Sequence, residues 1–165
     1  APNKLQRSLM RLDEAPAFMR GFVQNIILRR AVPFTGTAGV QFVSLTPERV
    51  EVRLANEHRV RNHIGSVHAS AMNLLAETAT GMAVGMNVRD DCIPLAKELS
   101  MAFKKRATGA LKAVATLTPE QCAAMQASDK GEVQVKVTVT DEAGVEPVEC
   151  AFTWAWVPSS RPAKN

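Results

Sequence analysis

The sequence predicts an α+β fold in which one antiparallel sheet wraps around a long buried helix. Residues 66–88 contain a single charged side chain, Glu77, and are apolar on every side of a helix, which is typical of a buried helix. Six segments around this stretch alternate apolar and polar residues with a period of two, as strands do. An apolar sheet face has to be covered, and this helix is the only candidate to cover it.

The first thirty residues have the spacing of two helices. Leu5, Leu9 and Leu12 share one helical face, and Pro16 suits the first turn of a second helix. Apolar residues then continue at helical spacing until Pro33, which is expected to end the run.

The predicted strands form two groups in the sequence, one before and one after the long helix. The first group is residues 40–45 and 49–54, and in the second of these Glu51 faces outward between two inward valines. The second group is residues 95–105, 110–117, 132–140 and 149–157. Residues 118–126 fit a short helix or a loop equally well.

Length and composition limit the function classes. A chain of 165 residues fits one domain. Three cysteines without CxxC spacing argue against a disulfide framework or zinc ribbon and suit a reducing cytosol. His58, His63 and His68 are spaced by five, do not share a helical face and predict no metal site. No basic-then-apolar signal segment opens the chain, so we expect a cytoplasmic protein.

The charge pattern gives little support to nucleic-acid or membrane binding. The net charge is +4, but the basic residues are scattered, tyrosine is absent and aromatics are few, so no base-stacking platform is visible. This basic surface is either simply solvated or attracts an anionic ligand such as a nucleotide-bearing cofactor. Residues 66–88 are long enough to cross a membrane, but their many polar and small residues argue against it.

Glu77 has two interpretations on the residues alone. Burying a carboxylate without a cation nearby is costly unless another group pairs with it. A partner from a strand would make Glu77 structural, whereas an unpaired Glu77 would be a candidate for chemistry.

The residues around the helix start are similar to those of a known family. Asn62 lies six residues before His68, Gly65 lies three before it, and Glu77 lies nine after it. This pattern resembles the hotdog-fold thioesterases of the PaaI-like and 4-hydroxybenzoyl-CoA thioesterase families, and most closely a bacterial branch of mostly unassigned function. The resemblance implies a single hotdog domain with a core at 36–157, an N-terminal helical extension at 1–33 and a flexible tail at 158–165.

The resemblance also implies roles for these residues in a thioester hydrolase. Glu77 would be the general base or the nucleophile that acts on an acyl-CoA or another acyl thioester. The backbone N–H of Ala69 would polarise the thioester carbonyl, which is chemistry that a helix N-terminus supplies. Asn62 would orient the attacking water or the substrate, and His68 would line the site or help to hold the carbonyl, with Gly65 also part of the catalytic group. Five further substrate contacts are expected, namely Ser70, Asn73, Lys104, Lys105 and Arg106.

The sequence departs from the family pattern at one point, where the usual Gly-Gly after the histidine is Ala69-Ser70. A backbone donor survives this change, but the added methyl group restricts bulky acyl groups. A non-catalytic acyl-thioester-binding protein is therefore the alternative to an enzyme. A hydratase fits less well, because the Pro-Gly pair before the helix is missing.

The resemblance implies no metal or redox cofactor, and coenzyme A would enter only as part of the substrate. A homodimer or a dimer of dimers is expected, because a lone hotdog domain leaves an open sheet edge and an incomplete site. The N-terminal extension, with Phe18, Phe22 and Ile26, is expected either to cover the acyl channel or to pack on the outer face of the sheet.

Overall fold

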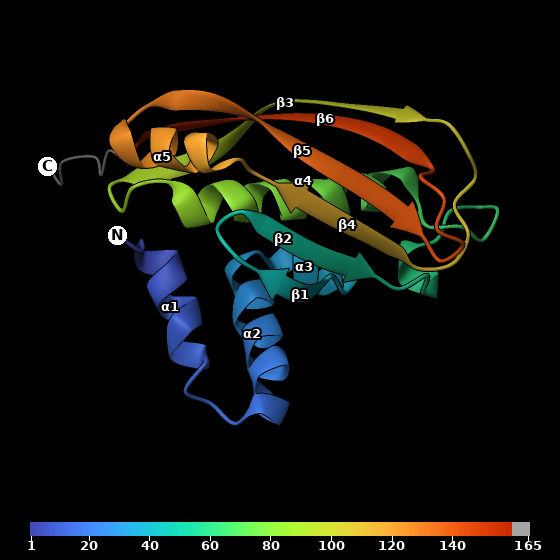
Figure 1. The fold of residues 1–165 in the computed structure, drawn as a ribbon. Coiled ribbons are helices and arrows are strands. Elements are labelled where there is room, and N and C mark those ends of the chain that lie inside the picture. The colour runs from blue at the N-terminus through green and yellow to red at the C-terminus, as the bar shows by residue number, and fades with distance from the viewer. Residues whose placement is uncertain (160–165) are drawn as a thin grey trace, which may run out of the picture.

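The computed structural model describes residues 1–159 and confirms the α+β hotdog fold (Figure 1). A six-stranded antiparallel sheet in the order β1-β2-β4-β5-β6-β3 curves around helix α4 (Ala69–Asn87). The strands are β1 (Gln41–Leu45), β2 (Arg49–Leu54), β3 (Cys92–Phe103), β4 (Leu111–Thr116), β5 (Gly131–Asp141) and β6 (Val148–Pro158). Most of the predicted tail, from residue 160 onward, lies outside the described residues.

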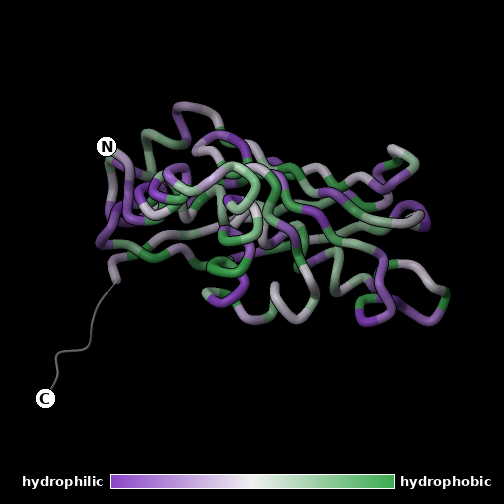
Figure 2. Tube along the Cα trace, turned by 90° about the horizontal axis from the view of Figure 1, so that it is seen from below, coloured by the Kyte–Doolittle hydropathy of each residue, from purple (hydrophilic) through white to green (hydrophobic). Residues whose placement is uncertain are grey.

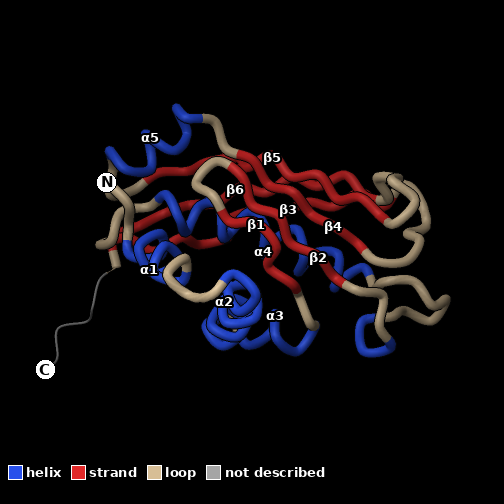
Figure 3. Tube along the Cα trace, turned by 60° about the horizontal axis from the view of Figure 1, so that its bottom comes forward, coloured by secondary structure: helices blue, strands red, loops and turns tan. Residues whose placement is uncertain are grey.

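Three helices precede the sheet, where the sequence predicts two. They are α1 (Lys4–Leu12), α2 (Ala17–Ala31) and α3 (Pro33–Ala38), and they lie together on the side of α4 away from β4 and β5 (Figures 1 and 3). Pro33 ends α2 as predicted, but it also occupies the first turn of α3, a position that proline favours. The chain then leaves α3 through Gly39, which has a left-handed φ of 81°.

The segment that fitted either a helix or a loop is helix α5 (Pro119–Ala127). Its start is fixed by a capping box, in which the Thr118 hydroxyl accepts from the Gln121 N–H and the Gln121 side chain accepts from the Thr118 N–H. A 3₁₀ turn (His58–Val60) lies between β2 and α4.

One side of α4 is packed completely against the sheet. Leu75, Ala76, Ala79 and Ala83 have no exposed surface, and the three alanines allow the strands to approach the helix closely. Apolar and polar stretches alternate along the strands that cover it (Figure 2).

Two strand predictions need correction. Glu51 was expected to face water, but only 8% of it is exposed, because Arg49 and Arg53 fold over it with N–O distances of 2.8 and 2.9 Å. Strand β3 begins at Cys92 rather than at residue 95 and ends at Phe103. Phe103 pairs with buried Val148 and therefore lies on the inner face of the sheet. It is nevertheless exposed in the single chain, because β3 is an edge strand.

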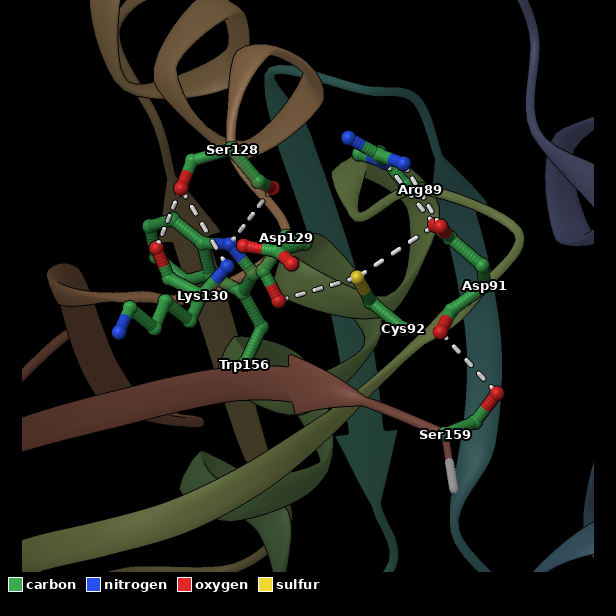
Figure 4. Close-up of polar contacts among 8 residues, drawn as sticks. All are labelled: Arg89, Asp91, Cys92, Ser128, Asp129, Lys130, Trp156 and Ser159. Carbon is green, nitrogen blue, oxygen red and sulfur yellow. Dashed lines mark hydrogen bonds and ion pairs between the residues drawn. The ribbon is translucent and has the colours of Figure 1, made fainter. Parts of the chain in front are cut away.

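The start of β3 is tied to the connection between α5 and β5 (Figure 4). The Cys92 thiol donates to the Asp129 carbonyl (3.3 Å), and the Trp156 indole N–H donates to the Ser128 carbonyl (3.1 Å). Desolvation, with the neighbouring Asp91 carboxylate, raises the pKa of Cys92. This thiol therefore stays protonated at neutral pH and has a structural role.

Candidate functional site

The loop before α4 is organised by Asn62. Its side-chain oxygen accepts from the backbone N–H groups of Ile64 and Ser66, both at 3.1 Å. Gly65 completes the turn with a left-handed φ of 78°. No acceptor for the Asn62 amide NH₂ is present among residues 1–159, so this group is available to a ligand.

His68 is the N-cap of α4. Its Nδ1 atom accepts from the Ser70 N–H at 3.0 Å, so Nδ1 carries no proton and the ring proton is on Nε2. The N–H of Ala69 is the first of the helix, and it has no acceptor in the described part of the chain. The helix start thus presents two donors, Ala69 N–H and His68 Nε2–H, where the helix dipole is positive.

Arg106 joins this loop from the connection between β3 and β4. Its guanidinium donates to the Ser66 hydroxyl (3.1 Å) and to the Ile64 carbonyl (2.6 Å). Lys104 pairs with Glu149 at 3.4 Å, and both lysines of the pair Lys104-Lys105 are exposed. The three predicted basic contacts therefore lie in one connection, but only Arg106 is joined to the loop.

Glu77 lies on the other side of α4 from the alanines. The helix is not buried all round as predicted, because this side is only partly covered and Glu77 is half-buried. Its carboxylate has no hydrogen bond or ion pair with any described residue. One turn earlier, the Asn73 side-chain oxygen is buried and also lacks a partner.

An apolar cavity of about 390 Å³ borders Glu77. Among the described residues that line it, Glu77 is the only charged one. The hydroxyls of Thr35 and Thr78 also border it, but they donate to the carbonyls of Val32, the N-cap of α3, and of Leu74 in α4 (2.7 and 2.6 Å). Its volume lies in the range of small-molecule sites, and among the described polar side chains that line it, only the Glu77 carboxylate has no hydrogen-bond partner.

The structure divides the predicted site into two groups. Asn62, Gly65, His68 and Ala69 lie at the start of α4, whereas Glu77 follows Ala69 by eight residues. At a rise of 1.5 Å per residue, this separation is about 12 Å along the helix. One thioester carbonyl cannot contact both groups within a single chain.

The residues predicted to cover an acyl channel do not line the cavity. Phe18, Phe22 and Ile26 are 86%, 69% and 36% exposed and are not among the cavity-lining residues, so the prediction is wrong for these three side chains. The same extension contributes Leu28 and Val32 instead. The small residues on the outer side of α4 were the only signal in the sequence that a cavity lies there.

The described residues lack two features, a metal-binding cluster and a membrane-spanning helix. Residues 1–159 contain no cluster of three or more His, Cys, Asp or Glu side chains that could hold a metal ion. None of the described helices combines the length and hydropathy needed to cross a membrane.

Comparison with known proteins supports the fold. A family model described as a domain of unknown function, DUF4442, matches residues 22–157. No curated protein matches the sequence.

Three solved structures of similar shape illustrate the match. A Pseudomonas aeruginosa protein of unknown function, described as a probable thioesterase, is 24% identical over 82% of this chain and 94% of its own, with a TM-score of 0.74. A Haemophilus influenzae thioesterase is 14% identical over 79% and 87%, with a TM-score of 0.63. A mutant Staphylococcus aureus thioesterase is 16% identical over 77% and 100%, with a TM-score of 0.64. At these identities the likeness establishes the fold.

Proposed function

We propose that this chain, which belongs to the DUF4442 family of domains of unknown function, hydrolyses acyl thioesters such as acyl-CoA. One observation carries this proposal: the unpaired Glu77 carboxylate borders an apolar cavity on the central helix of a hotdog fold. The cavity suits the acyl chain, and the carboxylate suits proton transfer or attack at the carbonyl where that chain begins.

Two chemical routes use this carboxylate. In the first, Glu77 takes a proton from water as the water oxygen attacks the carbonyl carbon, the C–S bond breaks, and the leaving thiolate takes up that proton. In the second, a Glu77 oxygen attacks the same carbon, expels the thiolate and forms an anhydride that water then cleaves. Both routes place negative charge on the carbonyl oxygen, so both require hydrogen-bond donors there.

Those donors come from a second copy of the chain in this proposal. The Ala69 N–H is about 12 Å from Glu77 along the same helix, which is too far for one carbonyl. Edge strand β3 exposes Leu95, Leu99 and Phe103, and such an edge invites pairing with another chain. A homodimer formed through β3 would bring each Glu77 to the partner's helix start, and two such dimers could associate further.

Asn73 is assigned a supporting role. It precedes Glu77 by one turn on the same helix side, and its buried oxygen has no donor among residues 1–159. A water molecule that donates one hydrogen to Asn73 and the other to Glu77 would satisfy this oxygen and be held for attack. Lys105 is exposed, and Arg106 is bonded to the loop next to the helix start. Both cationic side chains suit the phosphates of coenzyme A.

The test is thiol release from short, medium, long and aromatic acyl-CoAs by the wild type and by Glu77→Gln. Release that falls by about 10²–10⁴-fold in the variant supports the proposal. Glu51→Gln is the matched control, because it removes a carboxylate that lies away from the cavity. No release by a folded wild type that still binds acyl-CoA would instead identify an acyl-thioester-binding protein.

A further inference from the structure

We infer that the N-terminal helices make the cavity a length-selective pocket for a straight aliphatic acyl chain of about ten carbons. This inference deepens the proposed function and depends on it for the position of the thioester. It assigns to α1 and α2 a part in substrate selection.

Residues of α4 from Leu74 to Gly85 line the cavity, and the part beyond the Glu77 carboxylate extends from Glu77 to Gly85. These residues are eight apart, or about 12 Å along the helix axis. A fully extended chain advances about 1.2 Å per bond, judged from the reach of an extended polypeptide, so about ten bonds fit between the two ends.

The lining favours a hydrocarbon over a polar or aromatic acyl group. The Thr35 and Thr78 hydroxyls already donate within their helices, so neither is a free donor for a ring hydroxyl or a second carboxylate. The remaining walls are apolar, with Leu5, Leu28 and Met82 among them. A polar group at depth would lose its hydrogen bonds to water without replacement.

Helix α1 closes the far end of the cavity. The Asn3 amide donates to the carbonyls of Gly85 (2.9 Å) and Val88 (2.8 Å), and the Gln6 amide donates to that of Met86 (2.6 Å). These carbonyls belong to the last turn of α4 and its C-cap, which otherwise lack partners. The hydrogen bonds hold α1 in place, and its Leu5 side chain faces Gly85: a methyl group built on Gly85 would lie 3.5 Å from Leu5 Cδ2.

The experiment measures binding of S-alkyl-CoA thioethers with 4 to 16 carbons by calorimetry, because a thioether cannot be hydrolysed. For the wild type, affinity should rise about fourfold per methylene up to about ten carbons and then stop rising. Gly85→Leu fills the far end and should move the break point to shorter chains, whereas Leu5→Ala opens that end and should move it to longer ones. Gly21→Leu is the matched control, because Gly21 has open space around it away from the cavity.

The outcomes separate this inference from the proposed function. An identical break point in the wild type and both cavity variants, or no gain per methylene, would overturn the pocket. If the break point shifts as expected but the wild type releases no thiol from acyl-CoAs, the pocket stands and the hydrolase fails. If thiol is released at a rate independent of chain length, the hydrolase stands and the length-selective pocket fails.

Discussion

Two glutamates with little exposure occupy opposite environments in this fold. Glu51 on β2 is held between Arg49 and Arg53, and the hydrogen bond from Arg49 in particular lowers the pKa of its carboxyl, while burial opposes this shift. Glu77 on α4 has neither a cation nor a donor among the described residues and borders an apolar cavity. The contrast shows that pairing, not burial alone, separates a structural carboxylate from one that is available for chemistry.

After the loss of Glu77 itself, the largest expected effect concerns the Ala69 N–H, the donor that Glu77 cannot reach in its own chain. Ala69→Pro removes one N–H at the first helical position, where proline is well tolerated, and the extended backbone of His68 (ψ 144°) suits a residue before proline. Thiol release should fall by about 10²–10³-fold, as for the loss of one oxyanion donor, while thermal unfolding changes little.

Mixing two inactive variants tests whether the site is shared between chains. Equal amounts of Ala69→Pro and Glu77→Gln protein, unfolded and refolded together, form heterodimers with one intact site. Random pairing should restore about a quarter of the wild-type activity, because half the dimers are mixed and each has one of two sites. No recovery from a verified mixture of dimers would refute a site built from two chains.

The next effect concerns Gly81 and Gly85, the two glycines of α4 that line the cavity. A methyl group on Gly81 would lie 2.7 Å from the Trp154 ring, whereas one on Gly85 would make an ordinary contact at 3.5 Å. Gly81→Ala should therefore lower the free energy of unfolding by about 1–3 kcal/mol. Gly85→Ala should raise it by about 0.5–1 kcal/mol through the better helix propensity of alanine. Chemical denaturation measures the free energy of unfolding of both variants. Equal changes in the two variants would contradict the position of Trp154 against Gly81.

Periodicity was sufficient to predict most of the fold. The strict alternation at 49–54 predicted the bounds of β2 correctly, and the stretch with a single charged residue predicted α4, because both signals come from neighbouring residues. The edge position of β3 was not predictable in this way, since it depends on which strands pair, and the exposure of Leu99 follows from that position.

The candidate site was predicted only in part. The sequence indicated the group at the helix start and Glu77, but it contained no measure of the distance between them. The cavity was missed because its walls come from segments far apart in the chain, such as Leu5 and Trp154, and depend on tertiary packing. The pairing of Arg49 and Arg53 with Glu51 was missed for a different reason. The alternation places all three side chains on one face of the strand, but it does not show that the arginines fold over the carboxylate.

A smaller effect concerns the paired carboxylate. Glu51→Gln should lower the free energy of unfolding by about 1 kcal/mol at pH 7, a modest value because both arginines are half exposed. Because the folded state lowers the pKa of Glu51, its charge stabilises the protein fully above the ordinary value of 4.5, and this contribution disappears as the pH falls through the lowered pKa. Urea titrations should thus show a smaller difference from wild type at pH 3 than at pH 7.

The smallest effect concerns the stability cost of the unpaired carboxylate. A half-buried charge without a partner opposes folding, so Glu77→Gln should raise the free energy of unfolding by about 0.5 kcal/mol while it removes activity. Thermal and urea unfolding of the variant beside the wild type and Glu51→Gln provide the measurement. A Glu77→Gln protein less stable than the wild type would mean that the carboxylate has a structural partner in solution, and Glu77 would then belong to the same class as Glu51.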